Sequence, residues 1–275
     1  MQGKVYIIGA GPGDPELITV KAVKALKKAD VILTDRLVSQ EILEDYANPI
    51  AEIFLVGKEG CNNQKSVAQA DIDQLLLSKA MEGKIVARLK GGDVAFFSNV
   101  LNELEILNRF DIPYEIIPGI TAASGASAFA GIPLTARDYS RGVRFLTFSK
   151  KHHIDINNWD ELAKTDDTLV FYMAGEAWHE LANLLIENNI GNTKGLAVIE
   201  QATTPFQKVY NYSFEELKQE LPYIQFVSPS LIIVGNVVRL HNKFAWFESD
   251  HTKDNYFLPA DNCKKLKQVD FIKSK

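Results

Sequence analysis

Short apolar runs alternate with segments of helical periodicity along the first half of the chain. Val5–Gly9 is an apolar run that ends in glycine, which is typical of a buried parallel strand. After it, apolar residues recur at helical spacing as far as Ala29, and Thr19 stands where a helix cap is expected. The alternation predicts βαβ repeats, and hence a mostly parallel sheet covered by helices. The other strands expected are Val31–Leu33, Ile53–Val56, Lys84–Leu89 and Tyr114–Ile117, and the other helices begin at Ser39, Val67, Leu101 and Thr121.

The pattern changes after residues 132–142, a segment that contains proline, glycine and charged residues. Beyond it, apolar strand-like runs outnumber helical segments, which favours a mixed, partly antiparallel sheet. We therefore expect two α/β domains, residues 1–137 and 138–247, followed by a polar, loosely held tail at 248–275. The strands expected in the second domain are Arg144–Phe148, Thr168–Tyr172, Gly195–Glu200, Gln207–Tyr212 and Leu231–Val234, and the helices are Glu176–Asn188 and Phe214–Glu220.

The first strand runs into a glycine-rich loop, G-A-G-P-G-D-P at residues 9–15. A dinucleotide-binding turn would need a third glycine where Asp14 stands. Pro12 and Pro15 also lack the backbone N–H groups on which a phosphate-binding loop depends. The loop therefore favours a ligand without phosphates, or one with positive charge; a purely structural turn is the alternative.

Further candidate residues follow the other strands. Lys90–Asp93 (K-G-G-D) ends one strand, and Pro118–Ala126 leads into a helix of small side chains. Asp35 and Arg36 follow the second strand, and Lys58 follows the third. In an open parallel sheet the carboxyl ends of the strands share one edge, which is the usual ligand site. Taken singly, these residues are equally compatible with a tight turn, close helix packing and solvated charges.

Composition narrows the class of protein. The 275 residues correspond to about two domains at roughly 150 residues each. Lysine and arginine number 30 against 35 acidic residues, a net charge of −5 that argues against a general nucleic-acid-binding surface. The two cysteines, Cys61 and Cys263, do not suggest a disulfide framework, and no apolar run approaches the ~20 residues of a membrane span. We expect a soluble, cytoplasmic protein that binds neither membranes nor nucleic acids.

One stretch of the acidic chain is basic. Residues 136–153 carry five lysines and arginines against a single acid, Asp138. A local positive site of this kind suits a polyanionic partner, and a solvated linker is the alternative. His152 and His153 have no cysteine or carboxylate at ligand spacing, so no metal site is expected. The basic residues of the stretch are Arg137, Arg141, Arg144, Lys150 and Lys151.

The order of the motifs is more specific than any one of them. In the first half they are V-Y-I-I-G-A-G-P-G-D-P-E-L-I-T, A-D-V-I-L-T-D-R-L-V-S, V-G-K, R-L-K-G-G-D and I-P-G-I-T-A-A-S-G-A-S-A-F-A-G-I-P-L-T-A-R-D-Y. T-L-V-F-Y-M, V-I-E-Q-A-T-T-P and P-S-L-I-I-V-G-N-V-V follow in the second half. Over about residues 4–247 this series resembles the tetrapyrrole (corrin/porphyrin) methylase family.

The resemblance implies a two-domain α/β fold, usually a homodimer, with S-adenosyl-L-methionine bound between the domains. The implied reaction transfers two methyl groups to carbons 2 and 7 of uroporphyrinogen III. It gives precorrin-2, a precursor of sirohaem and cobalamin, and releases S-adenosyl-L-homocysteine. A cationic sulfur compound without phosphates agrees with the first loop, and an octa-acid substrate agrees with the basic stretch. A methylase of a different precorrin and a non-catalytic tetrapyrrole-binding paralogue stay open; Asp14 argues against a dinucleotide-dependent dehydrogenase.

Site residues follow from the resemblance position by position. Asp35 matches the family's proposed proton acceptor and Lys58 its proposed proton donor. Arg36, Arg137 and Arg141 are expected to bind the carboxylates of the substrate. The residues expected to contact the cofactor are Pro12, Gly91, Gly92, Asp93, Phe96, Thr121, Ala122, Met173 and Ala202.

Two segments depart from the family's usual sequence. After G-G-D the family usually continues P-F-I-F-G-R-G-G-E-E, whereas Val94–Glu103 reads V-A-F-F-S-N-V-L-N-E. Phe148-Ser149 stands where a Gly-His pair is common. Both segments are expected to face the substrate, so they bear on substrate choice.

Overall fold

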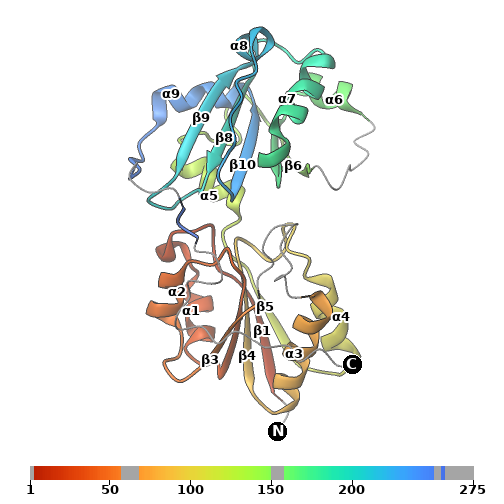
Figure 1. The fold of residues 1–275 in the computed structure, drawn as a ribbon, viewed down its shortest axis with the longest axis vertical. Helices are drawn as coiled ribbons and strands as arrows, with labels where there is room; N and C mark the ends of the chain where they lie inside the picture. The colour runs from red at the N-terminus through yellow and green to blue at the C-terminus, as the bar shows by residue number, and fades with distance from the viewer. Residues whose placement is uncertain (1–2, 57–67, 150–157, 251–254, 258–275) are drawn as a thin grey trace. The chain divides into compact units, whose positions relative to one another are not determined.

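The computed structural model describes residues 3–56, 68–149, 158–250 and 255–257. Within them the chain forms two compact units, one of residues up to Thr121 together with Phe257, the other of Ala122–Tyr256 (Figure 1). Each unit contains one five-stranded sheet, so each is described by itself.

The sheet of the first unit is entirely parallel, as the sequence predicted. Its strand order is β3-β2-β4-β1-β5, and β4 lies between β2 and β1, with Arg88 opposite both Leu33 and Ile7. The carboxyl ends of all five strands therefore lie at one edge. The strands are β1 (Lys4–Gly9), β2 (Val31–Thr34), β3 (Glu52–Leu55), β4 (Ile85–Lys90) and β5 (Tyr114–Ile117).

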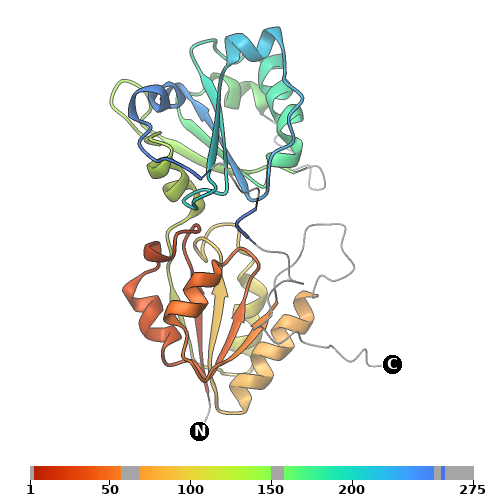
Figure 2. The ribbon, with the colours of Figure 1, turned by 60° about the vertical axis from the view of Figure 1, so that its left-hand side comes forward.

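Helices cover both faces of this sheet (Figures 1 and 2). Leu26 and Ile42 pack with Ile8 and Leu89 on one face, and the helices α3 and α4 pack on the other. Thr19 caps α1 as expected, because its Oγ1 accepts a hydrogen bond from Ala22 N at 3.2 Å. The helices are η1 (Pro15–Leu17), α1 (Val20–Leu26), α2 (Gln40–Tyr46), α3 (Gln69–Met81) and α4 (Leu101–Arg109).

The sheet of the second unit is mixed, again as predicted. Its order is β6-β7-β10-β8-β9; β6 and β7 are parallel, and β10 runs antiparallel to its neighbours β7 and β8. The ends of β7 and β8 therefore share one edge with the start of β10. The strands are β6 (Val143–Thr147), β7 (Thr168–Tyr172), β8 (Gly195–Glu200), β9 (Lys208–Ser213) and β10 (Ser230–Gly235).

Two layers of helix enclose the second sheet. The small residues of α5 pack with β8 and β10 on one face, and Trp178 and Leu181 pack on the other with Phe171 and Phe214. The helices are α5 (Ala122–Phe129), α6 (Trp159–Lys164), η2 (Gly175–Ala177), α7 (Trp178–Glu187), α8 (Phe214–Gln219), η3 (Asn236–Leu240) and α9 (His241–Phe244).

Three features differ from the expectation. The contacts divide the chain at Thr121/Ala122 rather than at 137/138, because α5 packs on the second sheet. The helices α6 and α9 were not expected. The described part of the tail is held in place: Tyr256 N donates to Gln201 Oε1 at 2.7 Å, and Phe257 is buried. No helix among the described residues has the length and apolar character to cross a membrane.

Candidate active site

Two glycine loops pair with each other at the carboxyl edge of the first sheet. Gly11 N donates to Gly92 O at 3.0 Å, and Gly92 N donates to Gly11 O at 2.7 Å. One residue earlier, Ala10 N donates to Lys90 O at 2.8 Å. Gly92 has a φ of +69°, a conformation that glycine adopts without strain. The loops after β1 and β4 are thereby fixed as one structure.

A third loop, after β5, closes on the first two. A Cβ atom added at Gly119 would lie 2.4 Å from Gly92 O and 2.7 Å from the carbonyl carbon of Gly9. Only hydrogen fits at that position, so the backbones of the three loops touch. Glycine is required here because the backbones approach so closely.

Asp93 joins two of these loops through its carboxylate. Its Oδ1 accepts a hydrogen bond from Ala95 N, and its Oδ2 accepts one from Gly119 N, each at 2.8 Å. The residue is buried, with 7% of its surface exposed. Asp93 therefore determines how the loops after β4 and β5 are held, whatever contact it makes with a ligand.

These hydrogen bonds bear on which ligand the edge accepts. The N–H groups of Ala10, Gly11 and Gly92 are used within the protein. Asp14 Oδ1 accepts from Glu16 N at 2.8 Å at the start of η1, so a carboxylate stands where a pyrophosphate would need donors. The edge therefore does not fit a dinucleotide phosphate. A ligand without phosphates, as the sequence predicted, is compatible with these contacts.

Asp35 lies at the same edge, directly after β2. Its backbone N–H donates to Leu89 O at 3.0 Å, and its Oδ1 lies 2.6 Å from Nη2 of Arg88. About a quarter of the Asp35 side chain (27%) is exposed, whereas Arg88 is buried. Arg36, the next residue, is half-buried.

Sequence reasoning missed Arg88. The sequence carried one signal for it: Arg88 is a charged residue within the run Ile85–Leu89, whose other members are apolar. Lone charges at buried positions are rare unless they are paired. Naming the partner required the register between β2 and β4, which the sequence does not show.

In the second unit, Ala122, Met173 and Ala202 come to one edge of the sheet. Met173 follows β7 and Ala202 follows β8, and both strands end beside the start of β10. Next to Ala122, Ala123 N donates to the hydroxyl of Tyr172 at 3.1 Å, which joins the start of α5 to the end of β7. Met173 is 58% exposed with a φ of +60°, and Ala202 is buried. Strained backbone at an exposed strand end is a feature of binding sites.

The two basic residues Arg137 and Arg141 are placed elsewhere in this unit. They precede β6, whose first residue pairs with Thr168 at the start of β7. They therefore lie at the edge opposite Met173. Both side chains are exposed. The structure does not bring these arginines to the edge that carries Met173 and Ala202.

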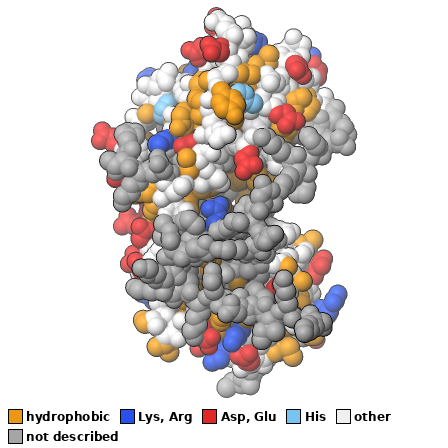
Figure 3. All heavy atoms as spheres, in the orientation of Figure 1, with side chains coloured by type: hydrophobic (Ala, Val, Ile, Leu, Met, Phe, Trp, Pro, Cys, Tyr) orange, Lys and Arg blue, Asp and Glu red, His pale blue; other side chains and the backbone are white. Residues whose placement is uncertain are grey.

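Arg144 also contributes less positive charge than the sequence suggested. It lies 2.6 Å from Glu161 and 2.8 Å from Asp167, so two acids neutralise it. On the face shown in Figure 3, acidic and basic side chains are interspersed among the described residues.

The other expected cofactor residues of the first unit are at least partly exposed. Pro12 and Thr121 are half-buried, and Phe96 is 37% exposed in the loop after β4. Lys58, Lys150 and Lys151 lie outside the described residues. Within the described ranges no group of three or more His, Cys, Asp or Glu side chains could hold a metal ion.

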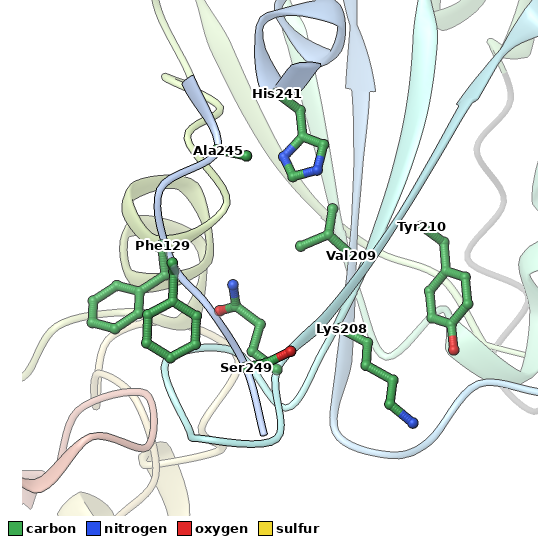
Figure 4. A pocket seen from close by; sticks show the side chains of 9 residues that line it. Phe129, Lys208, Val209, Tyr210, His241, Ala245 and Ser249 are labelled. Atoms are coloured by element: carbon green, nitrogen blue, oxygen red, sulfur yellow. The ribbon is translucent and has the colours of Figure 1, made fainter. Parts of the chain in front are cut away.

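The second unit also contains a pocket of about 360 Å³ on another part of its surface. The residues that line it include Phe129 of α5, Val209 of β9, His241 and Ala245 (Figure 4). His241 Nδ1 bonds to Ala130 O at 2.6 Å. Lys208 and Tyr210 point away from that group of side chains. None of the expected site residues lines this pocket.

Comparison with known proteins identifies the family. The family model "Tetrapyrrole (Corrin/Porphyrin) Methylases" matches residues 4–218. The chain belongs to the tetrapyrrole methylase family. The resemblance found in the motifs is confirmed.

Particular relatives agree with this assignment. The chain is 43% identical to uroporphyrinogen-III C-methyltransferase of Bacillus subtilis over 92% of this chain and 98% of that protein. It is 44% identical to siroheme synthase of Vesicomyosocius okutanii over 90% of its length but only 52% of the relative's. This chain thus spans about half the length of the siroheme synthases that it matches.

Among solved structures, the uroporphyrin-III C-methyltransferase of Thermus thermophilus is similar, with a TM-score of 0.71 and 33% identity. The alignment covers 86% of this chain and 94% of that one. That protein was crystallised in complex with S-adenyl homocysteine.

Proposed function

We propose that this protein transfers two methyl groups from S-adenosyl-L-methionine to carbons 2 and 7 of uroporphyrinogen III, giving precorrin-2 for sirohaem or cobalamin. The observation that carries the proposal is the sequence identity of 43%, over nearly the full length of both chains, to the uroporphyrinogen-III C-methyltransferase of Bacillus subtilis. The first glycine loop supports it, because the N–H groups of Ala10 and Gly11 are already paired with backbone carbonyls, which suits a ligand without phosphates. The family resemblance further supports a homodimer in the cytoplasm.

The residues proposed to hold the cofactor are placed at strand ends in both units. In the first unit Gly91, Gly92 and Asp93 form the loop after β4, with Pro12 in the loop paired to it. In the second unit they are Ala122, Met173 and Ala202. Phe96 and Thr121 complete the set. When bound, S-adenosyl-L-methionine supplies an electrophilic methyl group on a sulfonium.

The protein's part in the chemistry is to position the reactants and to accept a proton. Once a ring carbon has gained a methyl group, the macrocycle is positively charged and must lose a proton, so a fixed carboxylate beside it is useful. Asp35 meets that need in our proposal: it is partly exposed at the carboxyl edge and held at 2.6 Å by Arg88. Lys58 is proposed as proton donor, and Arg36 as a ligand of a substrate carboxylate.

The test of this mechanism is Asp35→Asn. The substitution keeps the size of the side chain and removes the proton acceptor. Loss of a general base lowers kcat by about 100-fold or more. We expect that loss in methyl transfer to uroporphyrinogen III, with S-adenosylhomocysteine affinity within about two-fold of wild type by calorimetry. Undiminished kcat would remove Asp35 from the mechanism.

A further inference from the structure

Behind Asp35 lies a chain of buried charges. Glu103 Oε1 accepts from Arg88 Nε at 2.7 Å, and both Glu103 oxygens accept from Lys90 Nζ, at 3.1 and 3.0 Å. Arg88 Nη2 continues to Asp35 at 2.6 Å. The Glu103 side chain is fully buried, and those of Arg88 and Lys90 are 3% and 4% exposed.

The strand pattern explains why these groups meet. Alternate residues of a strand share one face, so Arg88 and Lys90 point to the face on which Val86 packs against α3 and α4. Glu103 stands in the first turn of α4 on that same side. The result is a line of contacts from α4, through β4, to the end of β2.

Burying a charge costs free energy unless an opposite charge compensates it, so each charged side chain of this cluster needs its ion-pair partner. Two cations face two carboxylates, and Glu103 touches both cations. Burial and the nearby Arg88 lower the pKa of Lys90, in keeping with two cations held close together. Asp73 of α3 borders the cluster, and burial raises its pKa. Taking Glu103 away alone would leave Lys90 without its ion-pair partner and Arg88 paired with Asp35 only.

We propose that Glu103 is a positioning residue for the reaction: it fixes the guanidinium of Arg88 and thereby the carboxylate of Asp35. A guanidinium is planar and rigid, so holding Nε determines where Nη2 points. Nη1 adds hydrogen bonds to Leu89 O at 3.2 Å and Leu33 O at 3.4 Å, which keep the group in the plane of the strand ends. The inference rests on the proposed role of Asp35 as proton acceptor.

The experiment uses variants in which Lys90 is replaced together with Glu103, so that no cation is stranded. Lys90→Met with Glu103→Met removes one positive and one negative charge and leaves the Arg88–Asp35 pair. Replacing a buried ion pair by apolar side chains of similar volume is usually tolerated. Lys90→Met with Glu103→Gln is the matched variant, because the Gln oxygen can still accept from Arg88 Nε.

We expect the Met/Met variant to lose at least about ten-fold in kcat, since Asp35 is no longer held in one geometry. Its KM, and its S-adenosylhomocysteine affinity by calorimetry, should stay within about two-fold of wild type. The Met/Gln variant should recover most of the lost kcat. If Glu103 had a structural role alone, the Met/Met and Met/Gln variants would have the same kcat.

Two results would overturn the inference: a folded Met/Met variant with wild-type kcat, or equal losses in both variants. If the Met/Met variant does not fold, Glu103→Asp decides instead, because it keeps the charge and retracts the carboxylate; kcat must fall at constant KM. Failure of wild-type protein to methylate uroporphyrinogen III is a different result. It would refute the proposed function, and the role of Glu103 with it.

Discussion

At the scale of single residues, Asp93 shows how a motif residue can act through the backbone. Its two carboxylate oxygens accept hydrogen bonds from Ala95 N and Gly119 N, and the side chain is buried. The acid of G-G-D was expected to touch the cofactor. The structure gives it a further task, which is to hold two glycine loops in register.

We predict that Asp93→Asn weakens cofactor binding. An amide offers only one acceptor oxygen and leaves one N–H facing its NH₂ group. The loss of a charge-assisted hydrogen bond at a buried site costs about 1.5–3 kcal/mol. Calorimetry with S-adenosylhomocysteine should show a Kd weaker by about ten-fold or more. Asp45→Asn, at an exposed position of α2, is the control and should bind as wild type. Equal affinity in both variants would contradict the assignment.

Glu115 carries a pH-dependent contribution to stability. Hydrogen bonds from Lys21 and Lys4, at 2.6 and 2.7 Å, lower its pKa from 4.5 to about 2. A carboxyl whose folded pKa is depressed stabilises the fold above its unfolded pKa, and the effect disappears as pH falls through the folded value. The stabilisation is therefore complete above about pH 4.5 and lost towards pH 2.

We expect Glu115→Gln to have a lower Tm than wild type at pH 7, with the gap closing between pH 4.5 and 2. Thermal unfolding across that range measures it. The control is Glu105→Gln, at an exposed position of the same unit, which should leave the Tm at pH 7 close to that of wild type. A Glu115→Gln gap that is constant with pH would refute the interpretation.

At the scale of elements, the apolar pattern predicted most strands well. β7 and β8 have the predicted bounds, because each contains an unbroken apolar run, Leu169–Phe171 and Leu196–Ile199. The pattern missed α6, which is a single short helix of mixed composition. Arg88 was also missed, because its partners come from β2 and α4, and the contact depends on strand register. Patterns along the chain report burial, whereas pairings between elements depend on the fold.

The glycine loops yield a prediction at this scale. Gly119→Ala places a methyl group 2.4 Å from Gly92 O, so the loops must separate. Overpacking of this kind costs about 1–3 kcal/mol, and S-adenosylhomocysteine binding should weaken with it. Gly191→Ala is the control: the nearest atom to its added Cβ is Thr193 Oγ1 at 3.9 Å, so stability should change by less than about 0.5 kcal/mol. Denaturant unfolding compares the two; equal stability would disprove the close approach.

At the scale of the whole molecule, the order of the motifs gave the family, and the family model confirmed it. The sequence placed the domain boundary later than the contacts do, because the polar loop after α5 is more conspicuous than the change of sheet before it. The positive site expected at residues 136–153 rested only on the closeness of its basic residues along the chain. In the fold, Arg144 is paired with acids, and Arg137 and Arg141 lie at the amino end of β6.

The positions of the arginines predict which of them contributes most to binding the carboxylates of the proposed substrate. Arg36 adjoins Asp35 at the carboxyl edge of its sheet, whereas Arg137 and Arg141 lie at the edge away from Met173. We predict that Arg36→Glu raises the KM for uroporphyrinogen III more than the double variant Arg137→Glu/Arg141→Glu does. Initial rates at saturating methyl donor give both values. A larger rise for the double variant would make the basic stretch the main anion site.

The most direct measurement is the mass of the product formed from uroporphyrinogen III and isotopically labelled S-adenosyl-L-methionine. We predict a product that carries two labelled methyl groups, with carbon NMR placing them on carbons 2 and 7. One methyl group, none, or labels on other carbons would contradict the proposed reaction.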